Sequence, residues 1–203
     1  MAGIDWSFIA QKGIEGESEH LTGYVPREGS GFTVGSVDVG MHSGEKYGDL
    51  WTMLQSYANK QSPSGAGSIN LPLYEKLNPY ALRKDVLDEE ARKIEFDKDE
   101  IEYITQAKRY QYERKLGKME GWDKIHPKAK TILTSVGWQY GLDSDHFKDL
   151  YKLKGDRNKM AEQLIEFGKS EYEERRKLEA KHVKPSEETS YMEQWNKEDN
   201  IFA

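Results

Sequence analysis

Residues 31–40, "GFTVGSVDVG", form a short β-like run interrupted by glycines. Phe, Thr and Val favour strands, whereas a glycine within such a run marks a turn or a close approach of the backbone. We therefore expect a β-hairpin here. Asp38 lies within it, and a single carboxylate among hairpin residues requires an explanation.

The hairpin belongs to a wider segment that is rich in glycine. Residues 16–48 combine glycines with Thr, Val, Tyr and Phe, a composition that favours turns and short strands over helix. Before this segment, Asp5 is suited to accept hydrogen bonds from the first helical turn, and Trp6 and Ile9 follow with helical spacing. The sequence thus predicts a short helix ending near Glu15 and then a small β lobe.

The remainder of the chain is helical in character. Asp97, followed three residues later by Glu100, resembles a capping box and predicts that a helix starts there. His126-Pro127 predicts a second start, and the least polar stretch, residues 129–142, is expected to be the buried central helix. Further helical patterns cover residues 48–61, 143–153 and 156–182. Residues 62–68 are small and polar and are expected to form a loop.

Composition narrows the possible classes of function. The chain has 203 residues, a formal net charge of -6 and no cysteine. Nucleic-acid affinity depends mainly on clustered Lys and Arg, but here basic and acidic residues alternate, so we expect no nucleic-acid binding. The histidines lack the spacing of metal ligands, so we expect no metal site and no cofactor. No apolar run approaches the roughly 18 residues of a membrane span, and we expect neither membrane insertion nor a signal peptide.

Several short pieces, in this order, carry a family resemblance. They are "IEG" at 14–16, "GYVP" at 23–26, "SGFTVGSVDVG" at 30–40, "LNPYAL" at 77–82 and "ILTSVGWQYG" at 132–141. These pieces are spread over residues 14–141, and their order and spacing resemble those of T-even phage lysozymes and, more closely, of pesticin-like muramidases.

The resemblance implies an α+β, lysozyme-like fold with the active-site cleft between two lobes. The muramidase domain is expected over residues 1–182, with a small β-hairpin lobe at 16–48 and a larger all-helical lobe at 49–182. Residues 183–203 are expected to form a polar C-terminal tail.

The same resemblance implies a glycoside hydrolase that cleaves the β-1,4 bond between N-acetylmuramic acid and N-acetylglucosamine, with inversion. Glu15 matches the position of the general acid, which needs the raised pKa that burial at a helix end provides. Asp38 falls where these relatives carry their second carboxylate, and Thr33 matches the threonine that helps to hold the attacking water.

Three further residues are candidates for substrate binding. Gln139 is suited to hydrogen-bond an acetamido or hydroxyl group, and Trp138 lies beside it in the motif that lines the cleft of the resembling enzymes. Tyr24 is an aromatic residue of "GYVP". For Tyr24 and Trp138, stacking on a sugar ring and burial in the core both remain open.

One departure from the family pattern concerns Asp38. The relatives follow Thr-x-Gly-x-Gly-x-Asp, whereas "TVGSVD" at 33–38 is one residue shorter. A one-residue change in a strand reverses the face that a side chain occupies, so Asp38 either points away or is returned to the cleft by a turn or bulge. The alternative function is therefore a non-catalytic virion structural protein or cell-wall-binding protein that keeps the lysozyme fold.

The expected partner is peptidoglycan, with the chain acting as a monomer or as part of a phage virion. The expected route is synthesis in the host cytoplasm and delivery to the periplasm or cell wall by a holin, a virion or another partner. An endolysin, a tail-associated lysozyme and a bacteriocin domain remain open on the sequence.

Overall fold

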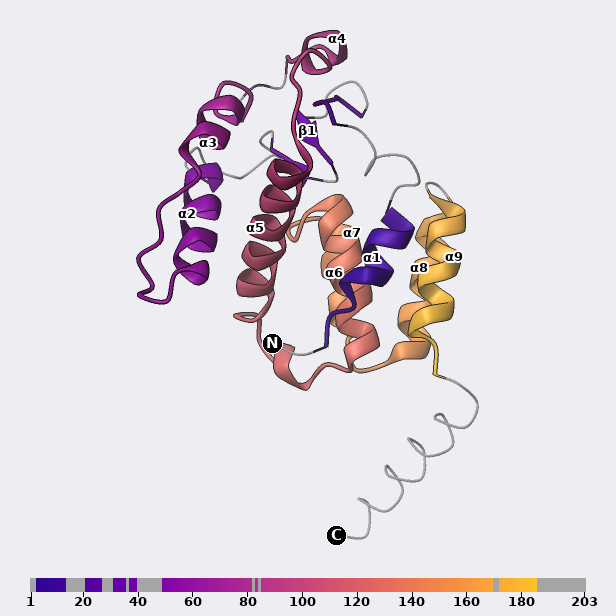
Figure 1. The fold of residues 1–203 in the computed structure, drawn as a ribbon. Helices are drawn as coiled ribbons and strands as arrows, with labels where there is room; N and C mark the ends of the chain where they lie inside the picture. The colour runs from indigo at the N-terminus through magenta and orange to yellow at the C-terminus, as the bar shows by residue number, and fades with distance from the viewer. Residues whose placement is uncertain are drawn as a thin grey trace, which may run out of the picture. The chain divides into compact units, whose positions relative to one another are not determined.

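The computed structural model describes residues 3–13, 21–26, 31–35, 37–39, 49–81, 83, 85–169 and 172–185 (Figure 1). Within these residues the chain is mostly helical, with one small antiparallel sheet of two strands, which is compatible with the expected α+β class. The helices are α1 (Trp6–Gly13), α2 (Asp49–Gln61), α3 (Leu71–Leu77), α4 (Asp88–Ala91), α5 (Lys98–Leu116), α6 (Pro127–Tyr140), α7 (Asp145–Lys152), α8 (Arg157–Gly168) and α9 (Glu173–Val183), with a 3₁₀ turn at Trp122–Lys124. The strands are β1 (Thr33–Val34) and β2 (Val37–Asp38).

The chain divides into two compact units. One unit comprises Met1–Lys12 and Glu120–Ala203, and is called the C-terminal unit; the other comprises Gly13–Met119 and is called the hairpin unit. The hairpin packs with α5, and α1 packs on α6, so that the first helix joins the last part of the chain.

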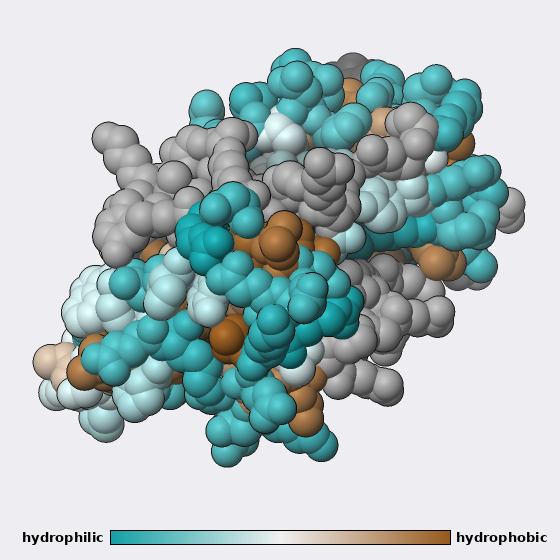
Figure 2. Space-filling model, turned by 90° about the horizontal axis from the view of Figure 1, so that it is seen from above, coloured by the Kyte–Doolittle hydropathy of each residue, from teal (hydrophilic) through white to brown (hydrophobic). Residues whose placement is uncertain are grey.

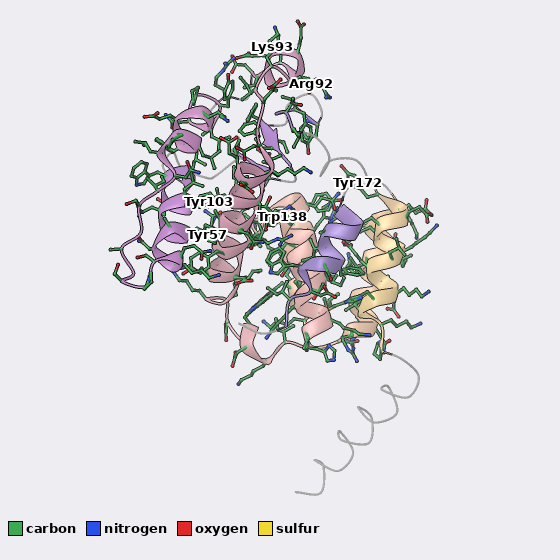
Figure 3. All side chains as sticks on the ribbon, viewed as in Figure 1. Tyr57, Arg92, Lys93, Tyr103, Trp138 and Tyr172 are labelled. Atoms are coloured by element: carbon green, nitrogen blue, oxygen red, sulfur yellow. The ribbon has the colours of Figure 1, made fainter. Side chains whose placement is uncertain are left out.

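In the hairpin unit, β1 and β2 lie beside a pair of packed helices, α2 and α5. The segment before the hairpin is tied to the chain between α4 and α5, where Thr22 pairs with Glu95. Tyr57 and Tyr103 meet edge to face between α2 and α5, with ring centroids 5.2 Å apart (Figure 3). The hairpin thus packs on α5, which in turn packs on α2.

In the C-terminal unit, α6 is the buried central helix that the sequence predicts. Every residue from Ala129 to Gly137 is buried. The predicted start is confirmed, because Pro127 is the first helical residue and the His126 ring accepts a hydrogen bond from the Lys128 backbone at 3.2 Å. Helices α7 and α9 pack on α6, and α8 packs on both of them.

The first helix also follows its prediction. The Asp5 carboxylate accepts a hydrogen bond from the Phe8 backbone at 2.9 Å and so caps α1. The Asp5 backbone N–H donates to the Thr131 hydroxyl at 2.9 Å, which attaches the start of α1 to α6. At the other end of the chain, α9 ends at Val183. Residues 186–203 of the expected tail lie outside the described residues.

The surface is largely polar where it is described. Figure 2 shows one face in which hydrophilic residues predominate and hydrophobic residues form small separate groups. This agrees with a composition in which 33% of the residues are charged. No helix among the described residues combines the length and the hydropathy needed to cross a bilayer.

The capping box at the start of α5 gives the first testable prediction. The Asp97 carboxylate accepts from the Glu100 backbone at 2.7 Å, and the Glu100 carboxylate accepts from the Asp97 backbone at 3.0 Å. Asp97→Ala removes the first of these bonds and is expected to lower the free energy of unfolding by about 1 kcal/mol, measured by urea denaturation. Asp99→Ala, which removes an exposed carboxylate from the same turn, is the control; equal losses in both variants would contradict a capping role for Asp97.

Candidate functional site

The hairpin holds Thr33 and Asp38 directly opposite each other. The strands β1 and β2 pair antiparallel, with Thr33 opposite Asp38 and Val34 opposite Val37. Opposed residues of an antiparallel pair project to the same face, with Cβ atoms about 4.5–5.5 Å apart. The Thr33 hydroxyl and the Asp38 carboxylate therefore share one face of the hairpin.

The turn explains how this arrangement survives the shortened spacing. Only residues 35 and 36 separate β1 from β2, and Gly35 opens the turn with φ at 56°. Glycine adopts this left-handed conformation without the steric cost of a side chain, and a Cβ on Gly35 would lie 2.9 Å from the Ile101 side chain. With this two-residue turn, Asp38 pairs with Thr33 and lies on the same face of the hairpin.

Tyr24 joins the same face from the preceding segment. Its backbone N–H donates to the Thr33 carbonyl at 3.0 Å, and the Thr33 N–H donates back to the Tyr24 carbonyl at 2.8 Å. The Tyr24 hydroxyl donates to the Gly35 carbonyl at 2.7 Å, and only 5% of the residue is exposed. Of the two possibilities left open for Tyr24, the structure shows core burial: the residue braces the hairpin turn.

The opposite face of the hairpin is apolar and anchors it. Phe32, Val34, Val37 and Val39 are all buried. The Phe32 ring stacks on Tyr80 with ring centroids 4.5 Å apart. Burial on this face stabilises a hairpin whose strands have only two residues each, because an isolated hairpin of this length is marginal in water.

The two polar residues of the hairpin differ in exposure. Thr33 is buried at 5% exposure, and its hydroxyl lies 3.3 Å from the Gly31 carbonyl, to which it donates. Asp38 is half-buried. A hydroxyl that donates to a carbonyl keeps its lone pairs as acceptors, and a carboxylate accepts protons, so the pair offers the groups needed to hold and deprotonate a water.

The predicted general acid, Glu15, lies outside the described residues. The helix that precedes it ends at Gly13, close to the predicted end near Glu15. The structure therefore brings together Tyr24, Thr33 and Asp38, in the hairpin unit.

The other two predicted substrate-binding residues lie near the end of α6, in the C-terminal unit. Trp138 packs edge to face against Trp6 of α1, with ring centroids 5.6 Å apart (Figure 3). Gln139 is half-buried, and its side-chain carbonyl accepts a hydrogen bond from the Arg176 guanidinium of α9.

Arg176 is the centre of a buried polar cluster that the sequence did not predict. Its guanidinium donates to the Glu179 carboxylate, and the side chains of both residues are 0% exposed. The other Glu179 oxygen accepts from the Ser135 hydroxyl at 2.5 Å and from Arg175 at 3.2 Å. We call these four residues, together with Gln139, the Arg176 cluster.

Aromatic rings and a glycine enclose the guanidinium. It lies 5.3 Å from the ring centroid of Tyr140 and 5.2 Å from that of Phe167. A Cβ on Gly168 would lie 2.6 Å from the Arg176 Cβ, so the absence of a side chain there lets α8 and α9 approach. The pKa of the Arg176 guanidinium lies below its ordinary value, because burial lowers it by more than the neighbouring Glu179 carboxylate raises it.

Local sequence patterns do not single out this cluster. "EERRKLEAKH" at 173–182 has the alternating charges of a solvated helix face, and Arg175 with Glu179 matches an ordinary pair four residues apart. Arg176 is buried and its neighbour Lys177 is exposed, and this difference arises from the packing of α6, α8 and α9.

No group of three or more His, Asp or Glu side chains among the described residues is arranged to hold a metal ion. Comparisons with protein-family models, with curated proteins and with solved structures find no significant match for this chain. Its function must therefore be argued from its own residues.

Proposed function

We propose that this chain is a peptidoglycan hydrolase of the lysozyme type, cleaving the β-1,4 bond between N-acetylmuramic acid and N-acetylglucosamine. The observation that carries the proposal is the register of the hairpin, in which Thr33 lies opposite Asp38. Under the family resemblance these two residues act together, and the shortened spacing was the reason to doubt that they face the same way.

The proposed chemistry divides the work among three side chains. Glu15 protonates the glycosidic oxygen as that bond breaks, and Asp38 removes a proton from the water that attacks the anomeric carbon. Thr33 holds this water by a hydrogen bond. In an inverting reaction the water needs room between the carboxyl groups, which are then about 6.5–9.5 Å apart.

Other features support the same proposal. The described part of the chain combines helices with a small antiparallel hairpin, an arrangement compatible with a lysozyme-like fold. The piece "ILTSVGWQYG" falls on the central helix α6, and Gln139 near its end offers an amide to a sugar substituent. Peptidoglycan is accordingly the proposed partner, and the cell wall the proposed place of action.

The test is the release of new reducing ends from purified Gram-negative sacculi by the full chain, combined with sedimentation of the protein with intact sacculi. A muramidase is expected to release soluble fragments that carry new N-acetylmuramic acid reducing ends. Sedimentation with the sacculi without any release would overturn the catalytic proposal in favour of a wall-binding protein, and neither binding nor release would overturn both.

A further inference from the structure

Gln139 carries two chemically different ends, and the structure distinguishes them. Its amide has a carbonyl oxygen that accepts hydrogen bonds and an NH2 group that donates two. An exposed glutamine is free to turn either end toward a ligand. Gln139 is instead half-buried near the end of α6, where Arg176 reaches it.

Arg176 admits one orientation of this amide. A guanidinium has five N–H donors and no acceptor, so only the carbonyl end of Gln139 is able to pair with it. The bond is charge-assisted, and such bonds are the stronger ones. The Gln139 NH2 group must then point away from Arg176, and no hydrogen-bond partner for it is found among the described residues.

The guanidinium itself is held in place. Its side chain is 0% exposed, it pairs with Glu179, and the Tyr140 and Phe167 rings lie on it. Glu179 is fixed in turn by Ser135 and Arg175. The orientation of the amide is thus set by a buried cluster and not by solvent.

We infer that Arg176 is a positioning residue that turns Gln139 into a donor-only subsite, which recognises the carbonyl oxygen of an acetamido group on an N-acetylated sugar. This inference rests on the proposed function, since it names the substituent that the same protein reads. An acetamido carbonyl is a strong acceptor, and both sugars of the proposed substrate carry one.

The decisive variant is Gln139→Glu, because it separates the two ends of the amide. A carboxylate still accepts from Arg176, so the buried cluster keeps its partner, but it no longer donates. We expect the affinity for the N-acetylglucosamine tetramer, measured by isothermal titration calorimetry, to fall about fivefold to tenfold. The de-N-acetylated glucosamine tetramer is expected to bind the wild type weakly and to lose nothing further in the variant.

Gln163→Glu is the matched control. It makes the same change of charge on α8, at a residue outside the Arg176 cluster, and is expected to leave the tetramer affinity unchanged. A Gln139→Glu protein that binds the acetylated tetramer as the wild type does would overturn the inference. So would equal loss in the two glutamate variants, which would indicate a general effect of charge.

A second pair of variants tests the positioning role of Arg176 directly. Arg176→Lys keeps a side chain that only donates, whereas Arg176→Gln introduces an amide with an acceptor of its own, which lets Gln139 turn around. Where near-ultraviolet circular dichroism shows both variants folded, lysine is expected to keep more of the affinity than glutamine. The reverse order would overturn the inference, and where either variant fails to fold, Gln139→Glu decides.

The subsite and the proposed function fail in distinguishable ways. Cleavage of sacculi together with unchanged tetramer binding by Gln139→Glu would remove the subsite and leave the hydrolase. Tetramer binding that depends on Gln139, without cleavage of sacculi, would retain the subsite and remove the hydrolase.

Discussion

Asp38→Asn is expected to lower the rate of reducing-end release from sacculi by about 100-fold to 10,000-fold, the range that a general base contributes. Asparagine has nearly the shape of aspartate but does not take up a proton from water. The buried apolar side chains that anchor the hairpin lie on its opposite face, so the substitution does not change them. The measurement is the initial rate at matched protein concentration, after circular dichroism has shown equal folding.

Two further variants are compared with Asp38→Asn. Asp143→Asn removes an exposed carboxylate and is expected to leave the rate unchanged. Glu15→Gln removes the proposed acid and is expected to reduce the rate at least as strongly as Asp38→Asn. If Asp38→Asn cleaves as fast as the wild type while Glu15→Gln is inactive, the hairpin carboxylate is not the base and the role of the Thr33 and Asp38 pair is wrong.

Arg176→Met is expected to lower the free energy of unfolding by about 3–5 kcal/mol, since removing one partner of a buried ion pair leaves the other uncompensated. Glu179 is 0% exposed, and among the described residues Arg175 and Ser135 remain as its hydrogen-bond partners in this variant. Gln139 also loses its donor. The measurement is the midpoint of urea denaturation, with the slope of the transition compared between the proteins.

Lys177→Met is the matched control, because it makes the same change at the adjacent position of α9. Lys177 pairs with Glu173 and Glu174 at the surface, where ion pairs contribute little, so the midpoint is expected to stay close to that of the wild type. A similar midpoint for Arg176→Met and Lys177→Met would show that Arg176 is not a buried structural cation.

Local signals were sufficient for much of the secondary structure. Asp5, Asp97 and His126 each begin a helix as predicted, because a helix cap depends on residues only a few positions apart. The low polarity of 129–142 was likewise enough to predict a buried α6. The predicted hairpin around Asp38 is also present. By contrast, residues 83–96 belong to the remainder that was expected to be helical, but the described part of this segment has a single helical turn, α4.

Composition and short-range spacing were enough to predict most of the helices, the position of the hairpin and the residues worth testing. The face that Asp38 shares with Thr33 became evident only from the folded chain, because the strand register depends on how the Gly35 turn packs against α5. Likewise, the burial of Arg176 depends on α6, α8 and α9 together, so charged residues that look alike along α9 differ in environment. Long-range packing, which no short window of sequence contains, made both distinctions.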